Sequence, residues 1–419
     1  MSSYIRTKNI YAARVFLIDE NGFFPTGLLK RVEKFLNCAY LLFQVVDNRI
    51  IPKQNYLSLK DLIEEPPIYP EQEEASSIIF KNISWIVQMP TGIGKTRVIK
   101  EALLKIQRPS LIITPSSNLK YQTFDYLLES FGERYVGLMD SNKPKPITVT
   151  NWHAISKQDP SFFNLFDTMF FDEFHNSAAL GFRDSNISHL NNIYYKYGLT
   201  ATNFKNDENA SILLESILAD ELYSISIQDA INKKYIVALA PIFLNVFNKG
   251  KIASGDYRTD YKDYIDNNSE RNSLCLDYCP KLVKNNIPTL ILVEHVEHGR
   301  YLQSNLPGFI FLNGQDESAK YNLNMVDKFN KGEIPGLIGT SVIGEGVNTK
   351  AAGAVFNMCG GKAKSEILQR AGRVVRNFPG KNVGYYFDFI DHGQKHLFKQ
   401  SKERRLIIEE SFGVKAKIL

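Results

Sequence analysis

The chain has 419 residues, of which 44% are hydrophobic and 23% charged, with a formal net charge of +5. Collagen-like and disordered classes are excluded, and the length predicts two or three globular domains. The four cysteines are too scattered for a disulfide framework, and neither a signal peptide nor a membrane-spanning run is recognisable, so we expect a cytoplasmic protein with no membrane partner.

Residues 1–60 are expected to form a small basic α+β domain. They contain nine lysines and arginines but four acidic residues, so the net charge of the whole chain lies here. Residues 11–19 and 40–46 are strand-like, and between them Thr26 would cap a helix with one apolar face. Lys30, Arg31 and Lys34 would then face solvent or DNA, because a basic surface gains affinity by releasing counterions from phosphates. A chance scatter of surface charge is the alternative.

From residue 67 onwards, short β-rich runs alternate with helical stretches, which predicts parallel sheets covered by helices on both faces. The pattern occurs twice, so we expect one α/β domain over residues 67–235 and another over residues 236–392. The expected strands lie at 84–89, 110–115, 147–152, 168–173, 197–202, 240–247, 288–294, 308–314, 336–341, 353–359 and 384–390. Residues 393–419 are expected to form a basic helical extension that is either solvated or in contact with nucleic acid.

The segment MPTGIGKT (89–96) follows an expected strand and precedes an expected helix, as a phosphate-binding loop does. Gly92 and Gly94 would let backbone amides surround the phosphates. Lys95 would neutralise the β- and γ-phosphates, and Thr96 would bind Mg²⁺. Met89 stands where the strict pattern has glycine. We therefore expect ATP and Mg²⁺ as ligands, held by Pro90, Thr91, Gly92, Ile93, Gly94, Lys95 and Thr96.

An acidic pair, Asp172 and Glu173, follows the apolar run TMFF, at the end of a strand where open α/β sheets bind ligands. Asp172 would hold Mg²⁺, and Glu173 would orient and deprotonate the attacking water. Solvation or helix capping would explain such a pair in isolation. Its position 77 residues after Lys95 favours the catalytic interpretation.

Arg370, Arg373 and Arg376 share one face of an expected helix in the second half of the chain. One interpretation is a solvated basic face. The other is that Arg373 and Arg376 reach across a cleft between the domains to the γ-phosphate, so that the nucleotide state opens and closes the cleft.

Taken in order, these motifs resemble those of superfamily-2 helicases of the DExH kind over residues 67–392. The resemblance implies two RecA-like P-loop domains in tandem, preceded by the small α+β domain. It also implies that Gln72, in YPEQ, reads adenine, that further ATP contacts come from Gly344, Glu345, Gly346, Arg373 and Arg376, and that Gln369 is catalytic together with the arginines. The implied nucleic-acid contacts are Thr114, Pro115, Ser116, Thr150, Asn151, Thr340 and Ser341, and the coupling residues are His175, Thr200, Ala201 and Thr202.

The N-terminal stretch NGFFPTGLLKRVEKF (21–35) and the second half, from LILVEHVEHGRYL (290–302) to FDFID (387–391), are similar to UvsW-type phage DNA helicases. This resemblance implies an ATP-dependent motor that remodels branched DNA (Holliday junctions, stalled forks and displacement loops) in recombination, repair and replication, with 3′→5′ polarity. A phage protein of this kind would work in the host cytoplasm. The expected partner is DNA, with single-strand-binding or recombination proteins as further partners, and the expected state is a monomer.

Three alternatives remain open at this point. They are the motor subunit of a restriction system, an RNA helicase, and a nucleotide-switched binding protein that does not hydrolyse ATP. The simultaneous presence of Lys95, Asp172, Glu173 and Arg376 argues against the last.

Overall fold

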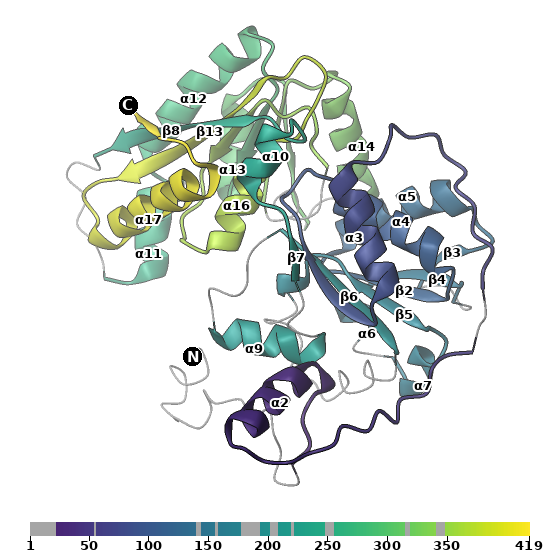
Figure 1. Ribbon diagram of the computed structural model, residues 1–419. Coiled ribbons are helices and arrows are strands. Elements are labelled where there is room, and N and C mark those ends of the chain that lie inside the picture. Colours follow the sequence, from purple (N-terminus) through teal and green to yellow (C-terminus); the bar gives the residue numbers. More distant parts are fainter. Residues whose placement is uncertain are drawn as a thin grey trace.

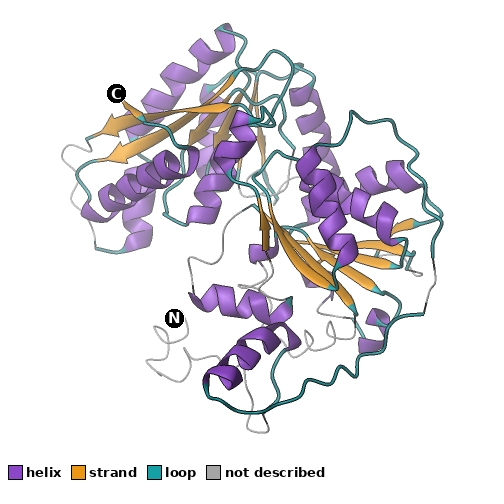
Figure 2. Cartoon of the chain, viewed as in Figure 1, coloured by secondary structure: helices purple, strands orange, loops and turns teal. Residues whose placement is uncertain are grey.

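The computed structural model describes residues 22–53, 56–139, 144–155, 158–176, 193–201, 208–218, 222–247, 255–314, 319–340 and 348–419. These residues form two α/β lobes, each built on one seven-stranded sheet, with a short helical segment beside the first lobe (Figures 1 and 2). The named strands pair in parallel throughout both sheets. The prediction of two RecA-like domains in tandem is confirmed.

The sheet of lobe 1 has the strand order β3-β4-β2-β5-β6-β1-β7. Its strands are β1 (Ser84–Gln88), β2 (Ser110–Thr114), β3 (Val136–Leu138), β4 (Ile147–Asn151), β5 (Thr168–Phe171), β6 (Tyr195–Thr200) and β7 (Leu222–Ser224). Five of them overlap the expected runs, and of these β6 begins two residues earlier than expected. The pattern missed β3 and β7 because a strand of three residues is too short to display an apolar periodicity.

Helices cover both faces of the lobe 1 sheet. They are α3 (Pro70–Lys81), α4 (Lys95–Ile106), α5 (Ser117–Phe131), α6 (Trp152–Ile155), α7 (Pro160–Phe163), α9 (Glu208–Ile217) and α10 (Ile227–Asn232), with the single turn η3 (Phe174–Asn176). Neighbouring strand residues pack in different layers, since Val87 belongs to the core with α3 and α4, whereas Ile86 belongs to the core with α6, α7 and α9. Burial on both faces explains the continuously apolar strands.

Lobe 2 repeats this architecture with the strand order β10-β11-β9-β12-β13-β8-β14. Its strands are β8 (Ala238–Val246), β9 (Thr289–Leu292), β10 (Phe309–Leu312), β11 (Gly336–Gly339), β12 (Ala354–Asn357), β13 (Val383–Asp391) and β14 (Lys417–Ile418). Its helices are α11 (Tyr257–Tyr261), η6 (Lys262–Asp266), α12 (Ser269–Lys284), α13 (Val296–Asn305), α14 (Ala319–Asn330), α16 (Lys364–Gly372) and α17 (Lys395–Phe412). The six longer strands overlap the expected runs, although β8 begins two residues early and β13 extends one residue beyond its run at each end.

The C-terminal segment forms the expected helix, but it is an integral part of lobe 2. Helix α17 packs against β13 and α16, and β14 then joins the edge of the sheet beside β8. Arg404 of this helix is fully buried in ion pairs with Asp388 and Asp391, which corrects the interpretation of α17 as uniformly solvated. The other basic side chains remain toward the outside because the period of the helix separates them from Arg404.

The N-terminal segment differs from the prediction in its second strand. Thr26 lies in the turn η2 (Thr26–Leu28), which leads into α2 (Leu29–Cys38), and no side chain caps either element. Residues 41–50 form no strand, and Leu42 and Val46 in them are exposed. A strand needs a hydrogen-bonding neighbour, and none pairs with this segment among the described residues. The other expected strand, 11–19, lies outside the described residues.

No helix in the described part of the chain combines the length and the apolarity needed to cross a bilayer.

Candidate active site

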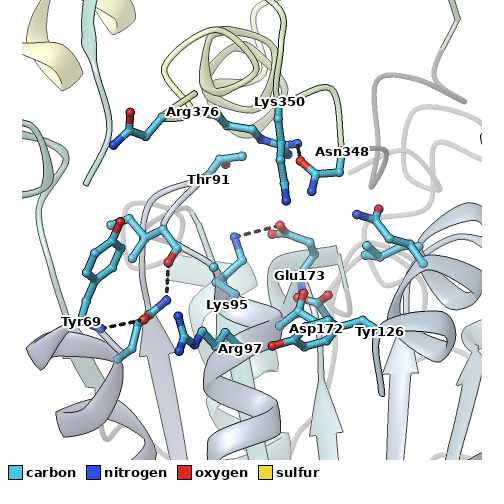
Figure 3. A pocket seen from close by; sticks show the side chains of 18 of the residues that line it. Tyr69, Thr91, Lys95, Arg97, Tyr126, Asp172, Glu173, Asn348, Lys350 and Arg376 are labelled. Carbon is cyan, nitrogen blue, oxygen red and sulfur yellow. Dashed lines mark hydrogen bonds and ion pairs between the residues drawn. The ribbon is translucent and has the colours of Figure 1, made fainter. Parts of the chain in front are cut away.

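A cavity of about 450 Å³ lies between the two lobes. Lobe 1 contributes the phosphate loop and the residues that follow β5, and lobe 2 contributes residues 348–350 and 369–377. Figure 3 shows side chains entering this space from both sides. Of the residues predicted to bind or hydrolyse ATP, the cavity is lined by Gln72, Thr91, Gly92, Ile93, Gly94, Lys95, Thr96, Asp172, Glu173, Gln369, Arg373 and Arg376.

The phosphate loop bends back between β1 and α4 because two glycines adopt positive φ, +99° at Gly92 and +92° at Gly94. A Cβ at Gly94 would also lie 2.8 Å from Nε2 of Gln72. Helix α4 starts at Lys95, so its unpaired N-terminal amides lie beside the loop, which is an arrangement that binds anions. Met89 is fully buried, so this departure from the strict pattern anchors the loop in the core.

Gln72, the expected reader of adenine, holds the phosphate loop in this structure. Its Nε2 donates a hydrogen bond of 2.6 Å to the carbonyl of Ile93, and its Oε1 accepts one of 3.0 Å from the amide of Tyr69. The Tyr69 ring stacks on that of Tyr235 with 4.1 Å between centroids. Gln72 thus ties the start of α3 to the loop, and the reading of adenine stays a prediction.

Lys95, Asp172 and Glu173 meet on the floor of the cavity. The Lys95 ammonium lies 2.9 Å from Oε1 of Glu173. Burial acts to raise the pKa of the Glu173 carboxyl, but Lys95 and His175 outweigh burial and lower it. Burial and the neighbouring Glu173 charge together raise the pKa of Asp172 to about 7. Glu173 also has a positive φ of 49°, an uncommon backbone conformation that aims its side chain at this point.

Arg373 and Arg376 enter the same cavity from lobe 2. Arg376 donates a hydrogen bond of 2.5 Å to Oδ1 of Asn348, and Arg373 is 3% exposed. Burial lowers the pKa of Arg376 to about 10, against the opposing effect of Glu173, so the guanidinium stays cationic at neutral pH. The lobes are in contact here, since a Cβ on Gly372 would lie 2.8 Å from Cβ of Thr91. The structure therefore describes a closed cleft.

The segment that links the lobes is attached to both sides of the site. Glu71, next to Gln72, accepts hydrogen bonds from Lys233 and Tyr235. Two residues further on, the amide of Val237 donates a 2.8 Å hydrogen bond to the carbonyl of Val375, beside Arg376. Movement of the linker is therefore transmitted both to the base end of the nucleotide site and to the arginines.

Three of the four expected coupling residues are described. His175 Nδ1 lies 3.0 Å from Oγ1 of Thr200, and His175 Nε2 lies 3.3 Å from Nε2 of Gln369. Ala201 follows Thr200 directly, lines a small cavity beside Pro90 and Gly372, and thus sits between the lobes. Thr202 lies outside the described residues.

The expected nucleic-acid contacts of lobe 1 have diverse surroundings. Thr114 and Thr150 are fully buried, and the Thr114 hydroxyl donates to the carbonyl of Thr150 at 3.0 Å, so neither hydroxyl faces a surface in this conformation. Ser116 caps α5, Asn151 is 7% exposed, and Pro115 lines the central cavity.

The remaining expected contacts lie elsewhere. Thr340 of lobe 2 is 8% exposed. Lys30 and Lys34 are exposed on α2, whereas Arg31 forms an ion pair of 2.5 Å with buried Glu215. Ser341, Gly344, Glu345 and Gly346 lie outside the described residues.

Sequence reasoning missed Lys350 as a residue of this cavity. Asn348 also lines it and was not among the predicted site residues. No local pattern distinguishes them, since both lie just before the amino end of β12, whereas ligand contacts are expected at the carboxyl ends of parallel strands.

Two family models match the chain. One, described as "Type III restriction enzyme, res subunit", matches residues 65–205, and the other, "Helicase conserved C-terminal domain", matches residues 273–378. These matches correspond to the two sides of the cavity.

Similar proteins include two DNA motors. The chain is 25% identical to the ATP-dependent DNA helicase UvsW of Enterobacteria phage T4, over 90% of this chain and 81% of that protein. It is 24% identical to the DNA 3′-5′ translocase XPB2 of Sulfurisphaera tokodaii, over 79% and 83%. Among solved structures, S. cerevisiae Dbp5 bound to RNA and ADP BeF3 has a TM-score of 0.59 at 15% identity, over 84% of this chain and 94% of that one, which shows a shared fold.

Proposed function

This chain is an ATP-dependent DNA helicase with the two motor domains of superfamily 2, and we propose that it remodels branched DNA with 3′→5′ polarity. The observation that carries the proposal is the closed cavity in which Lys95, Glu173 and Arg376 meet from two lobes. Both halves of the site lie on one polypeptide, so we propose that a monomer suffices for hydrolysis.

In the proposed reaction, the phosphate loop and Lys95 bind the β- and γ-phosphates, and Arg373 and Arg376 neutralise the γ-phosphate from the opposite lobe. Glu173 holds the attacking water and accepts one of its protons. The water oxygen forms a bond to Pγ, while the bond from Pγ to the bridging oxygen breaks and leaves its electron pair on ADP. Loss of phosphate then removes the anion that holds the arginines against lobe 1, and the cleft opens.

The residues present suit Mg²⁺. The Thr96 hydroxyl and the Asp172 carboxylate are hard oxygen ligands, and both line the cavity. The pKa of buried Asp172 is raised because burial and the Glu173 charge outweigh the nearby Lys95, so a further cation at this carboxylate would be favourable. When bound, Mg²⁺ would neutralise charge on the β- and γ-phosphate oxygens.

The N-terminal helix supports a role at branches because it is docked beside the motor. Arg31 pairs with Glu215 of α9, and a Cβ on Gly27 would lie 2.0 Å from the Glu215 carbonyl, so the two segments are in tight contact. Figure 1 shows α2 next to α9 below lobe 1. Lys30 and Lys34 stay exposed on this helix. We propose that they hold a duplex arm by its phosphates, which requires no base sequence.

The polarity is proposed from two similar proteins whose names include it, the XPB2 translocase and the DNA 3′-5′ helicase XPB of Kineococcus radiotolerans. Restriction-system motors remain a second candidate, because the model that matches lobe 1 takes its description from one.

The proposal is tested by steady-state ATP hydrolysis with single-stranded DNA, duplex, forked DNA, a four-way junction and RNA, with Lys95→Ala as the inactive control. We expect the fork and the junction to stimulate hydrolysis most and RNA least. Unwinding of forks with only a 3′ or only a 5′ single-stranded arm tests the polarity. Equal stimulation by blunt duplex and junction would refute the preference for branches, and stronger stimulation by RNA would favour an RNA helicase.

A further inference from the structure

Lys350 extends from lobe 2 into the catalytic cavity. Figure 3 shows its side chain running from the lobe 2 backbone toward Lys95 and Glu173, alongside Arg376. Within the described part of the chain its ammonium has no acidic partner. Lysines on protein surfaces usually extend into solvent, where the charge is fully hydrated. A lysine directed into a cavity between two lobes therefore indicates an anionic ligand.

The backbone that carries Lys350 is held from three directions. Asn330 of α14 donates to the Asn348 carbonyl at 2.8 Å and accepts from the Ala351 amide at 3.1 Å. Lys381 donates to the carbonyl of Lys350 at 3.3 Å and to that of Ala352 at 2.9 Å.

The third contact that fixes this segment is the hydrogen bond from the Arg376 guanidinium to the Asn348 side chain. Ala351 and Ala352 are buried, so the turn is anchored in the core of lobe 2. Lys350 and Arg376 therefore move as one unit when the lobes open or close.

The charges around the cavity favour a ligand with several negative charges, whose terminal anionic group lies next to Lys350. Lys95 and Glu173 on the floor already neutralise one another at 2.9 Å. Arg373, Arg376 and Lys350 add three positive charges from lobe 2. Among the described residues, lobe 2 contributes no carboxylate to the lining that would balance them. A group that binds between Lys95 and these three side chains needs several negative charges, as the γ-phosphate of ATP has.

We propose that Lys350 is a catalytic residue that contacts the γ-phosphate of ATP, as a third cation of lobe 2 beside Arg373 and Arg376. It stabilises the charge on the γ-phosphate oxygens while the bond from Pγ to the bridging oxygen breaks, and it transfers no proton. This proposal rests on the ATP hydrolysis proposed above, and it adds Lys350 to the residues that carry out that reaction.

The test compares Lys350→Met, Lys350→Arg and the matched control Lys284→Met, an exposed lysine at the end of α12. We measure kcat and KM for ATP with saturating forked DNA, affinities for ADP and the non-hydrolysable analogue AMP-PNP, and the thermal midpoint. Lys350→Met is expected to lower kcat about 100- to 1,000-fold, the scale of removing one charge-stabilising donor. AMP-PNP should bind more weakly while the ADP affinity and the midpoint stay unchanged. Lys350→Arg should retain most of the activity, and Lys284→Met should match the wild type.

Wild-type kcat in Lys350→Met would overturn the proposal. So would an equal loss of ADP and AMP-PNP affinity, which indicates general electrostatics or misfolding, or a loss confined to DNA affinity, which indicates a contact with the strand. A failure of the proposed function can be told apart from a failure of the Lys350 proposal, because in the first case the wild-type protein itself would show no DNA-stimulated ATP hydrolysis.

Discussion

His175 in lobe 1 and Gln369 in lobe 2 contact each other across the cleft, with 3.3 Å between their Nε2 atoms. The Gln369 amide donates, so the histidine nitrogen must accept, and Nδ1–H then donates to Thr200. Burial lowers the pKa of His175, which favours the neutral ring that this pattern requires. The contact joins His175, two residues after Glu173, to the end of β6 and to α16, the helix that ends just before Arg373.

This contact predicts that hydrolysis and movement are separable. His175→Ala and Gln369→Ala are each expected to reduce unwinding by about tenfold or more. DNA-independent ATP hydrolysis should change little in His175→Ala, because His175 is not among the residues that line the ATP cavity. The double variant should be no worse than either single one, with a coupling energy of about 0.5–3 kcal/mol. Unwinding and ATPase assays on the same preparations provide the measurement. Additive losses would show that the two side chains act independently.

Arg376 is expected to act in the transition state. Arg376→Gln should lower kcat by about 10³-fold, as expected for an arginine finger, with little change in ADP affinity. Arg376→Lys should restore little, because a lysine cannot reproduce the planar guanidinium that also binds Asn348. Arg258→Gln, a change at an exposed residue of α11, is the matched control. An ADP affinity that falls as much as kcat would instead indicate a collapsed site.

Asp172 is expected to make the nucleotide-free protein less stable as the pH rises. Its pKa is raised from 3.8 to about 7 by burial and by Glu173, so the folded state binds more protons than the unfolded state between these values. Stability is therefore lost as the pH rises from about 4 to about 7. Asp172→Asn removes this dependence and should gain about 1–4 kcal/mol relative to the wild type over that range, since one pKa unit corresponds to about 1.4 kcal/mol.

The measurement for Asp172 is urea unfolding at several pH values without nucleotide or Mg²⁺. Asp277→Asn, an exposed change on α12, serves as the control. Parallel stability curves for the wild type and Asp172→Asn would contradict the prediction. Added Mg²⁺ with ADP should reduce the difference, because the cation compensates the carboxylate.

The ion pair between Asp388 and Arg404 is expected to matter for stability. Both side chains are fully buried, with 2.9 Å between Nη2 and Oδ1. Asp388→Ala should cost about 3–5 kcal/mol, because it leaves a buried guanidinium poorly compensated. Asp388→Leu combined with Arg404→Met should recover most of this loss. Urea unfolding of the single and double variants measures the effect, and a double variant as unstable as the sum of the two single changes would disprove the compensation.

Strand positions and the phosphate loop were predictable because their determinants are local. Ile86 and Val87 belong to a continuously apolar run, and Gly92, Gly94 and Lys95 stand at fixed spacings between a strand and a helix. Burial on two faces and a loop with positive φ both leave such short-range signatures.

The surroundings of individual side chains were decided only by the tertiary structure, because they depend on neighbours that are distant in the sequence. The sequence allowed Arg376 to be solvated or catalytic, and the packing of the lobes places it opposite Glu173 together with Lys350. The resemblance implied that Thr114 contacts nucleic acid, and the C-terminal helix was expected to be solvated or in contact with nucleic acid, but the side chains of Thr114 and Arg404 are both buried. Burial and the electrostatic field at a side chain are produced by the surrounding atoms, so residue type and spacing alone do not determine them.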